Sequence, residues 1–209
     1  MPTIALVSNK GGAGKTTLAM NLAAGLSRRA GTRLLDADPQ GSASQWAMVA
    51  DAVDAFGQVL SAHEELAGHI GEGRGHSRYQ VIDCPPSIHA PQTRTALEAA
   101  DLALIPVQPS PVDLWATAHI AQVVEEIQAA NRALRAFLVV NQLEPRTTLS
   151  RLIGDALGEL DLPALSIAVR RRAVYRNCVI EGRSVYDMGA RGAAAVAEIE
   201  AIIEEVLPT

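Results

Sequence analysis

The chain has 209 residues, of which 48% are hydrophobic, 20% are charged and only 3% are aromatic, and its formal net charge is −5. This length and composition suit one α/β domain with an aliphatic core. The chain is too short for two domains that each have a sizeable core of their own. The acidic balance excludes a polycation, so any basic surface must be local. We therefore expect a single domain over residues 1–209.

Apolar runs alternate with helix-like stretches along the whole chain. Strands are predicted over 3–8, 32–36, 79–83, 101–106, 136–141 and 164–168. Helices are predicted over 15–29, 42–53, 90–99, 112–130, 147–160, 172–181 and 190–206, and segment 71–75 is predicted to be a surface loop. This alternation predicts right-handed crossovers and a three-layer α/β/α fold with a mainly parallel, twisted sheet. In such a sheet, a ligand site lies beyond the carboxyl ends of the strands.

Targeting and redox signals are few. The first strand is expected within the first residues, which leaves no room for a signal peptide, and no apolar run is long enough for a membrane span. Cys84 and Cys178 lie far apart without metal-ligand spacing, and the histidines are scattered. We expect a cytoplasmic protein with reduced thiols and no structural metal, in which Cys84 is a small core residue.

Only two of the 18 Lys and Arg residues are lysines, and Lys10 and Lys15 both flank one glycine cluster. The segment Gly-Gly-Ala-Gly-Lys-Thr fits a tightened phosphate-binding loop (P-loop), set between a predicted strand and a predicted helix. Its backbone N–H groups and the helix N-terminus are expected to form an anion-binding nest. The nest residues are Gly11, Gly12, Ala13 and Gly14.

The side chains that follow the glycines complete this motif. Lys15 is expected to reach the β- and γ-phosphates of a nucleotide, because a compact ammonium on a flexible stem can enter a crowded phosphate site. Thr16 is expected to ligate Mg²⁺, and Thr17 to donate a hydrogen bond to the α-phosphate.

Polar side chains follow four other predicted strands. Asp36 and Asp38 lie at the end of the second strand, Asp83 ends the third, a proline-rich loop begins near residue 106, and Asn141 ends the fifth. A single Asp at such a place is equally well explained as a helix cap or a turn residue. Together, on the P-loop side of the sheet, they predict a nucleotide site.

These motifs resemble the ParA/MinD group of P-loop ATPases with a deviant Walker A motif, over nearly the whole chain. The marks are residues 10–17, with the extra signature lysine, then Asp-x-Asp-Pro-Gln-Gly at 36–41, Asp-x-Pro-Pro at 83–86 and a weaker match over 175–185. Segment 36–41 is closer to ParA than to MinD. Small size and Gln45-Trp46 resemble the short ParA subgroup without an N-terminal DNA-binding domain. Segment 30–35 departs from the family by being slightly shorter, which bears on the length of the second strand.

The resemblance implies an ATPase that is slow on its own and that uses ATP and Mg²⁺. Thr16 would ligate the metal directly, while Asp36 and Asp83 would accept hydrogen bonds from its waters. Asp38 would position the attacking water, and Asn141 would recognise adenine. Lys10 would cross to the nucleotide of a second subunit in an ATP-dependent sandwich homodimer, in the role of an arginine finger.

The same resemblance implies a ParA-type protein that binds DNA non-specifically, at the nucleoid, and positions a cargo. A ParB-like or other small partner would stimulate hydrolysis, and a plasmid, a chromosomal locus or a protein assembly could be the cargo. The predicted DNA contacts are Arg170, Arg171, Arg172 and Arg176. Two alternatives for this cluster are salt bridges to the acidic C-terminal helix and a place at the dimer interface.

Two other functions were weighed against this one. A MinD-like ATPase that cycles on a membrane needs a basic amphipathic C-terminal helix, but residues 197–207 are acidic. We therefore expect no membrane partner. A metabolic enzyme on the same scaffold would be an iron-protein reductase, which needs a cluster-bridging cysteine pair that Cys84 and Cys178 do not form, or a ligase, which would not need Lys10.

Overall fold

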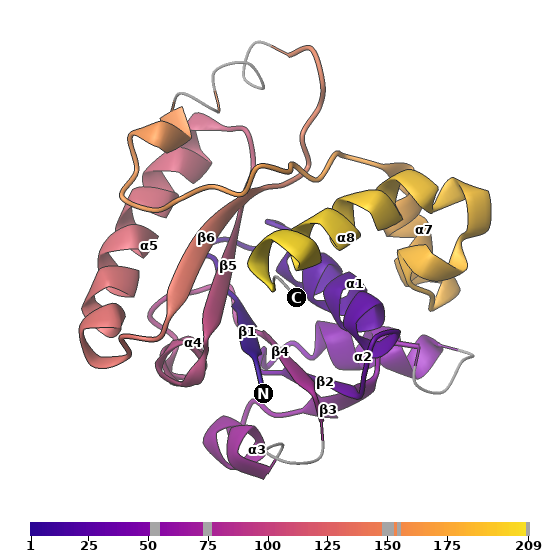
Figure 1. Cartoon of the computed structure of the whole chain (residues 1–209), viewed down its shortest axis with the longest axis horizontal. Helices are drawn as coiled ribbons and strands as arrows, with labels where there is room; N and C mark the ends of the chain where they lie inside the picture. Colours follow the sequence, from indigo (N-terminus) through magenta and orange to yellow (C-terminus); the bar gives the residue numbers. More distant parts are fainter. Residues whose placement is uncertain (51–54, 73–76, 148–152, 154–155, 208–209) are drawn as a thin grey trace.

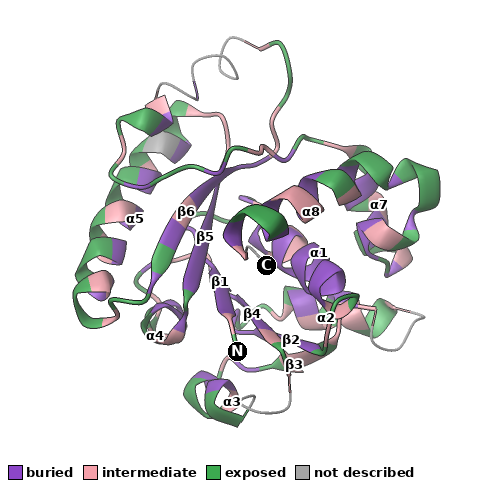
Figure 2. Cartoon of the chain, in the orientation of Figure 1, coloured by how far each residue is buried: buried purple, intermediate pink, exposed green. Residues whose placement is uncertain are grey.

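The computed structural model describes residues 1–50, 55–72, 77–147, 153 and 156–207. Its centre is a parallel sheet with the strand order β3-β2-β4-β1-β5-β6 (Figure 1). The strands are β1 (Thr3–Leu6), β2 (Thr32–Asp36), β3 (Gln58–Ser61), β4 (Tyr79–Asp83), β5 (Leu102–Val107) and β6 (Arg135–Val140). Every residue of β1, β2 and β5 is buried, as expected for strands covered on both faces (Figure 2).

Helices cover both faces of this sheet. One face packs against α1 (Lys15–Ser27), α2 (Ser42–Val49), α7 (Ala173–Glu181) and α8 (Ala193–Val206). The other face packs against α3 (Leu66–Glu72), α4 (Pro91–Ala99) and α5 (Pro111–Ala130). The predicted α/β architecture with a parallel sheet is therefore confirmed. Within the described part of the chain, no helix has the length and apolarity to cross a membrane.

Several predicted boundaries are close to those observed. The predictions 32–36 and 79–83 match β2 and β4 residue for residue, so the short segment before β2 still leaves a strand of five residues. Cys84 and Cys178 are both buried and free, and Cys84 belongs to the core. The predicted helix 190–206 begins only at Ala193, because two short 3-10 turns, η1 (Val185–Asp187) and η2 (Gly189–Arg191), precede it.

The predicted strand at 164–168 is wrong. This segment runs beside β6, but it is joined to it only through an isolated bridge, Leu138 to Ala164, and scattered backbone hydrogen bonds. Pro163 precedes the segment and has no N–H to donate, which helps to keep the ladder from extending. An apolar run in the sequence therefore marks burial here but not a regular strand.

Two elements of the structure, β3 and α3, were not predicted from the sequence. Both are short, β3 leaves Gln58 and Ser61 exposed at the sheet edge, and α3 contains Gly68 and Gly71. The predicted loop at 71–75 is wrong at its start, since α3 extends to Glu72, and residues 73–76 lie outside the described residues. The helix predicted over 42–53 ends at Val49. Residues 51–54, and much of the helix predicted over 147–160, also lie outside the described residues.

The C-terminal helix α8 is part of the core. Ile199, Ile202 and Ile203 are fully buried in the cluster that joins α8 to α1 and to the sheet. Its glutamates lie on the other side of the helix, apart from the buried Glu198. The apolar face of this helix is therefore used inside the protein.

Gly182 and Gly189 allow a matched test of the packing between α2 and α7. Both have a positive φ, 60° and 55°, so alanine at either position costs about 1–2 kcal/mol of backbone strain. A Cβ at Gly182 would lie 2.4 Å from the carbonyl oxygen of Val49, whereas at Gly189 it would meet no described atom within 4 Å. We expect Gly182→Ala to lower the free energy of unfolding by about 1–3 kcal/mol more than Gly189→Ala, measured by urea denaturation. Equal losses would show that the two helix ends do not pack as described.

Candidate nucleotide-binding site

The loop between β1 and α1 has the backbone of an anion-binding nest. Gly12 and Gly14 adopt positive φ values of 80° and 93°. A side chain at Gly14 would also collide with Asn141, because its Cβ would lie 2.2 Å from the amide nitrogen. Helix α1 begins immediately after Gly14 without a side-chain cap, so its first N–H groups are available to an anion.

Three carboxamides hold the carbonyl groups of this loop. Gln108 Nε2 donates to the carbonyl oxygen of Gly12 at 2.7 Å, and Gln142 Nε2 donates to the same oxygen at 2.9 Å. Asn141 Nδ2 donates to the carbonyl oxygen of Ala13 at 2.7 Å. With its carbonyls bound on this side, the loop can present N–H groups to a ligand. The hydrogen bonds from these carboxamides to the loop were not predicted. Their positions just after β5 and β6 did indicate polar groups at the carboxyl edge of the sheet.

Lys15 is buried beneath the loop. Its ammonium donates to Ser8 Oγ at 2.9 Å and lies 3.5 Å from the carbonyl oxygen of Lys10. Burial lowers the pKa of Lys15, and the nearby carboxylate of Asp83 partly offsets this effect. The side chain is thus a cation with little hydration, which suits it to bind phosphate oxygens.

Asp36 and Asp83 are direct neighbours in the register of β2 and β4, and both are fully buried. Thr16 Oγ1 donates to Asp83 Oδ2 at 2.6 Å, and the backbone N–H of Ser44 donates to Asp36 Oδ2 at 2.8 Å. The Oδ1 atom of each carboxylate is buried and has no hydrogen-bond partner among the described residues. Two unpartnered carboxylate oxygens beside a threonine hydroxyl fit the donor set of a hydrated Mg²⁺ ion.

Burial raises the pKa of Asp83 to about 7. The hydrogen bond from Thr16 acts in the opposite direction, and the charge of Asp36 adds to the rise. A cation bound between these groups would remove the cause of the shift, since it would favour the charged carboxylates.

Asp38 lies at the entrance to this cluster. Its Oδ1 accepts a hydrogen bond from the backbone N–H of Gln40 at 2.9 Å, which orients the carboxylate. It lines a hollow of about 350 Å³ together with Lys15, Thr16 and Gln40. This position is compatible with the predicted contact to an attacking water.

The ammonium of Lys10 is bound to α5 and not to the loop that Lys10 precedes. Its ammonium lies 3.1 Å and 3.3 Å from the two carboxylate oxygens of Asp113, in the first turn of α5. Asp113 is buried, whereas 46% of the Lys10 side chain is exposed. Asp113 was not predicted from the sequence to contact Lys10. Its only local feature is that it is an acidic residue three positions after the helix cap Ser110, which is an ordinary place for such a residue.

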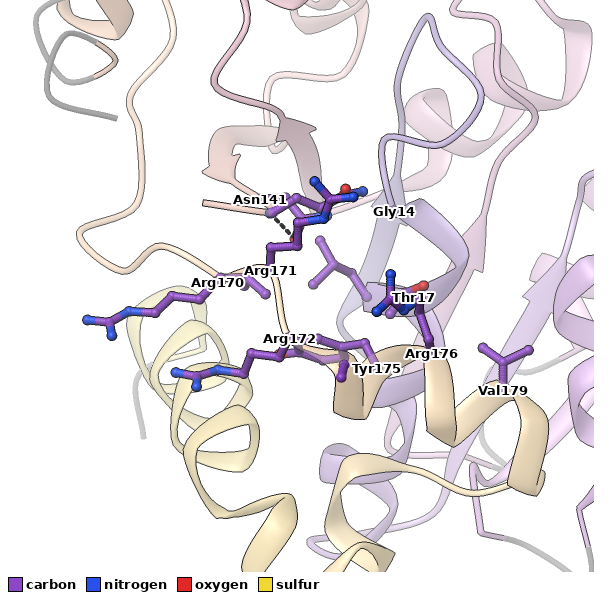
Figure 3. Close-up of a pocket in the computed structure, with 13 residues that line it drawn as sticks. Gly14, Thr17, Asn141, Arg170, Arg171, Arg172, Tyr175, Arg176 and Val179 are labelled. Carbon is purple, nitrogen blue, oxygen red and sulfur yellow. Dashed lines mark hydrogen bonds between the residues drawn. The ribbon is translucent and has the colours of Figure 1, made fainter. Parts of the chain in front are cut away.

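A larger cavity of about 570 Å³ opens beside the P-loop (Figure 3). It shares Gly14, Thr17, Gln142 and Val179 with the smaller hollow, so the two adjoin each other. Asn141, Val169 and Tyr175 form part of its wall, and Arg170, Arg171, Arg172 and Arg176 line it as well. A nucleotide with its phosphates in the nest would place its base in this cavity.

The predicted DNA-binding arginines divide into different environments. Arg172 forms an ion pair with Glu198 of α8, with Nη2 2.7 Å from Oε1, and this hydrogen bond raises the pKa of Arg172. The pair is shielded, since only 7% of the Glu198 side chain is exposed. Arg172 thus takes the alternative role, a salt bridge to the C-terminal helix, and is a poor DNA contact.

The other three arginines of the cluster are exposed. Arg171 Nη1 lies 2.6 Å from Glu144 Oε1 on the surface, a pair that contributes little to stability. All three line the larger cavity. In Figure 3 the side chain of Arg170 extends away from Asn141 and Gly14, whereas Arg176 extends from α7 towards Thr17. Arg170 and Arg171 therefore remain exposed candidates for a DNA contact at the rim of the cavity, and Arg176 is directed to the P-loop side of it.

A P-loop before the first helix, with carboxylates at the ends of neighbouring parallel strands, defines a P-loop nucleotide-binding protein. The chain belongs to the family of CobQ/CobB/MinD/ParA nucleotide-binding domains, whose model matches residues 4–185. Within this family it is a P-loop ATPase of the ParA type.

Known relatives agree with this assignment. The chain is 42% identical to maintenance of carboxysome distribution protein A of Halothiobacillus neapolitanus over 209 residues, covering 99% of this chain and 97% of that protein. Its fold is similar to that of McdA from Cyanothece, with a TM-score of 0.76, 18% identity and 99% of each chain covered. It is equally similar to MinD of Pyrococcus horikoshii complexed with Mg-ADP, with a TM-score of 0.76, 21% identity and coverage of 99% and 96%.

The raised pKa of Asp83 predicts how the metal-free protein responds to pH. The folded chain keeps this proton up to about pH 7, whereas an ordinary aspartate in the unfolded chain loses it near 3.8. Between these values the folded state binds more protons than the unfolded state, so the free energy of unfolding falls as the pH rises. Asp83→Asn has no carboxyl group to titrate at this position. The free energy of unfolding of the variant, relative to that of the wild type, should therefore increase from about pH 4 to about pH 8.

Urea unfolding of both proteins without Mg²⁺, across this pH range, measures the difference. A difference that does not vary with pH would contradict the raised pKa.

Proposed function

We propose that this protein is a ParA-type ATPase that closes into an ATP-dependent sandwich dimer and positions a cargo. The observation that carries the proposal is the separation of its two lysines. Lys15 lies buried under its own P-loop, whereas 46% of the Lys10 side chain is exposed and its ammonium is paired with Asp113 on α5. Lys10 therefore does not serve the nest of its own chain and is available to a second copy.

The residues of one chain suffice to bind a nucleotide. The nest at 11–14 and Lys15 would hold the β- and γ-phosphates, and Thr17 would donate to the α-phosphate. Thr16, with Asp36 and Asp83 through water, would hold Mg²⁺, which neutralises charge on the phosphates when bound. The adenine would lie in the larger cavity near Asn141, whose amide nitrogen is already bonded to Ala13.

Hydrolysis would require two further groups. Asp38, oriented by the N–H of Gln40, would position the attacking water in line with the γ-phosphate. Lys10 of the second copy would exchange its pair with Asp113 for the developing charge on the phosphates. Because this step needs a dimer, an isolated chain would turn over slowly.

The dimer would bind DNA without sequence specificity. Arg170 and Arg171 are exposed and adjacent, and a two-fold dimer doubles this small basic surface. Arg172 is left out because its guanidinium is bound to the shielded Glu198. A protein of this kind would work in the cytoplasm at the nucleoid, and a ParB-like or other small partner would stimulate hydrolysis and release the DNA.

The relative named for carboxysome distribution, at 42% identity over almost the whole chain, supports a carboxysome or a similar protein assembly as the cargo. A MinD-like membrane cycle receives no support from the C-terminal helix. The apolar residues of α8 are packed against α1 inside the core, and the remaining face is acidic.

The two lysines should separate in their effects. Lys10→Ala should keep ATP affinity close to that of the wild type yet lower turnover by roughly a factor of 10³ or more, as for other charged fingers acting in trans. Lys15→Ala should lose ATP binding, because the nest alone cannot replace the hydration of the phosphates. Calorimetric titration with ATP and a phosphate-release assay measure the two quantities.

Asp113→Asn is the matched control for Lys10→Ala, because it breaks the same ion pair and keeps the lysine. It should retain turnover. Wild-type turnover in Lys10→Ala would rule out the role in trans.

DNA binding should require ATP and the two exposed arginines. Arg170→Glu with Arg171→Glu should abolish binding to a DNA duplex of arbitrary sequence while ATP-dependent dimerisation continues. The salt dependence of wild-type binding should have a slope of about −0.9 per phosphate neutralised. Arg94→Glu with Arg132→Glu changes the charge equally at other exposed positions and serves as the control. DNA affinity unchanged in the first variant would move the DNA surface elsewhere, and lost dimerisation would place the two arginines at the subunit interface.

A further inference from the structure

Arg176 stands at the junction between the phosphate nest and the larger cavity. It belongs to α7, where Tyr175, Arg176 and Val179 lie at helical spacing on one face, and all three line the cavity together with the N-cap residue Arg172. Ile180 and Arg183 follow on α7 and just after it, and neither lines this cavity. The position of Arg176 on the helix therefore directs it to the nucleotide site.

The side chain of Arg176 is free to bind a ligand. Arg172 pairs with Glu198 and Arg171 pairs with Glu144, but in the described part of the chain no hydrogen bond or ion pair engages Arg176. Figure 3 shows its side chain extending from α7 towards Thr17, and both residues line the cavity. An unpaired guanidinium at a concave site adds a fixed positive charge with several donors.

The neighbours of Arg176 indicate which part of a nucleotide it would meet. The nest and Lys15 lie in the smaller hollow, which Arg176 does not line. The larger cavity begins at Gly14 and Thr17 and continues past Asn141 to Tyr175. A nucleotide that passes from one to the other places its α-phosphate beside Thr17, where Arg176 enters.

We propose that Arg176 is a nucleotide-binding residue of this chain, whose guanidinium contacts the α-phosphate of the nucleotide held in the same subunit. This inference rests on the proposed ATPase function, and it replaces the DNA contact predicted for Arg176 from the sequence. It also assigns α7 a direct part in closing the nucleotide site. Because ATP and ADP share the α-phosphate, Arg176 strengthens the binding of both and does not distinguish them.

The test compares Arg176→Gln with Arg183→Gln. Both substitutions remove one exposed guanidinium, and Arg183 lies just beyond the end of α7 and outside the cavity. Calorimetric titrations with ATP and with ADP, each with Mg²⁺, are expected to show a loss of affinity of roughly ten- to a hundred-fold for both nucleotides in Arg176→Gln. Arg183→Gln is expected to bind both as the wild type does. Thermal unfolding of the nucleotide-free variants checks that each is folded.

Each other outcome is decisive. Unchanged affinity for ATP and ADP in Arg176→Gln overturns the assignment, and a simultaneous loss of DNA binding would return this arginine to the DNA surface. A loss confined to ATP places the guanidinium at the γ-phosphate and overturns the α-phosphate contact. If the wild-type protein itself bound neither nucleotide, the proposed ATPase function would fail, and this result is distinct from a failure of Arg176 alone.

Discussion

The arrangement of the site depends on two carboxylates that parallel strand pairing forces together. Asp36 and Asp83 end β2 and β4 at the same register position, and the helices on both faces bury them. Each keeps one oxygen without a partner among the described residues, and their mutual repulsion contributes to the raised pKa of Asp83. Such a pair is costly unless a cation compensates it. Lys15 supplies part of that compensation from the protein, and a metal bound with a nucleotide would supply the rest.

The phosphate loop is stabilised by contacts with strands that are distant in sequence. Carboxamides at the ends of β5 and β6 bind the carbonyl groups of Gly12 and Ala13, so the loop is held in shape by the rigid sheet. A loop ordered in advance loses less conformational entropy when it binds a ligand. Gly14 is required in this arrangement, because a side chain there would displace Asn141, which is one of the residues that hold the loop.

Charged residues of the same type that lie close together in the sequence have different environments in the structure. Lys15 is buried and directed at the nest, while Lys10 is exposed and held by the buried Asp113. Arg172 and Arg176 are one helical turn apart, yet the first is bound to Glu198 and the second is unpaired within the described residues. The difference between these two arginines follows from what packs against each guanidinium, in particular from Glu198 on α8.

The sequence by itself determined the strands with continuous apolar runs, the P-loop and the carboxylates at the strand ends. These features are local or follow from the rule that parallel strands end at one edge of the sheet. It did not determine β3 and α3, because these segments are short and half-exposed and their apolar residues show only a weak periodicity. It also did not determine the irregular course of segment 164–168 beside β6. The pairs Lys10–Asp113 and Arg172–Glu198 join residues far apart in the chain. Only the tertiary structure decided these contacts, because the partner of a long polar side chain depends on which helices the sheet brings beside it.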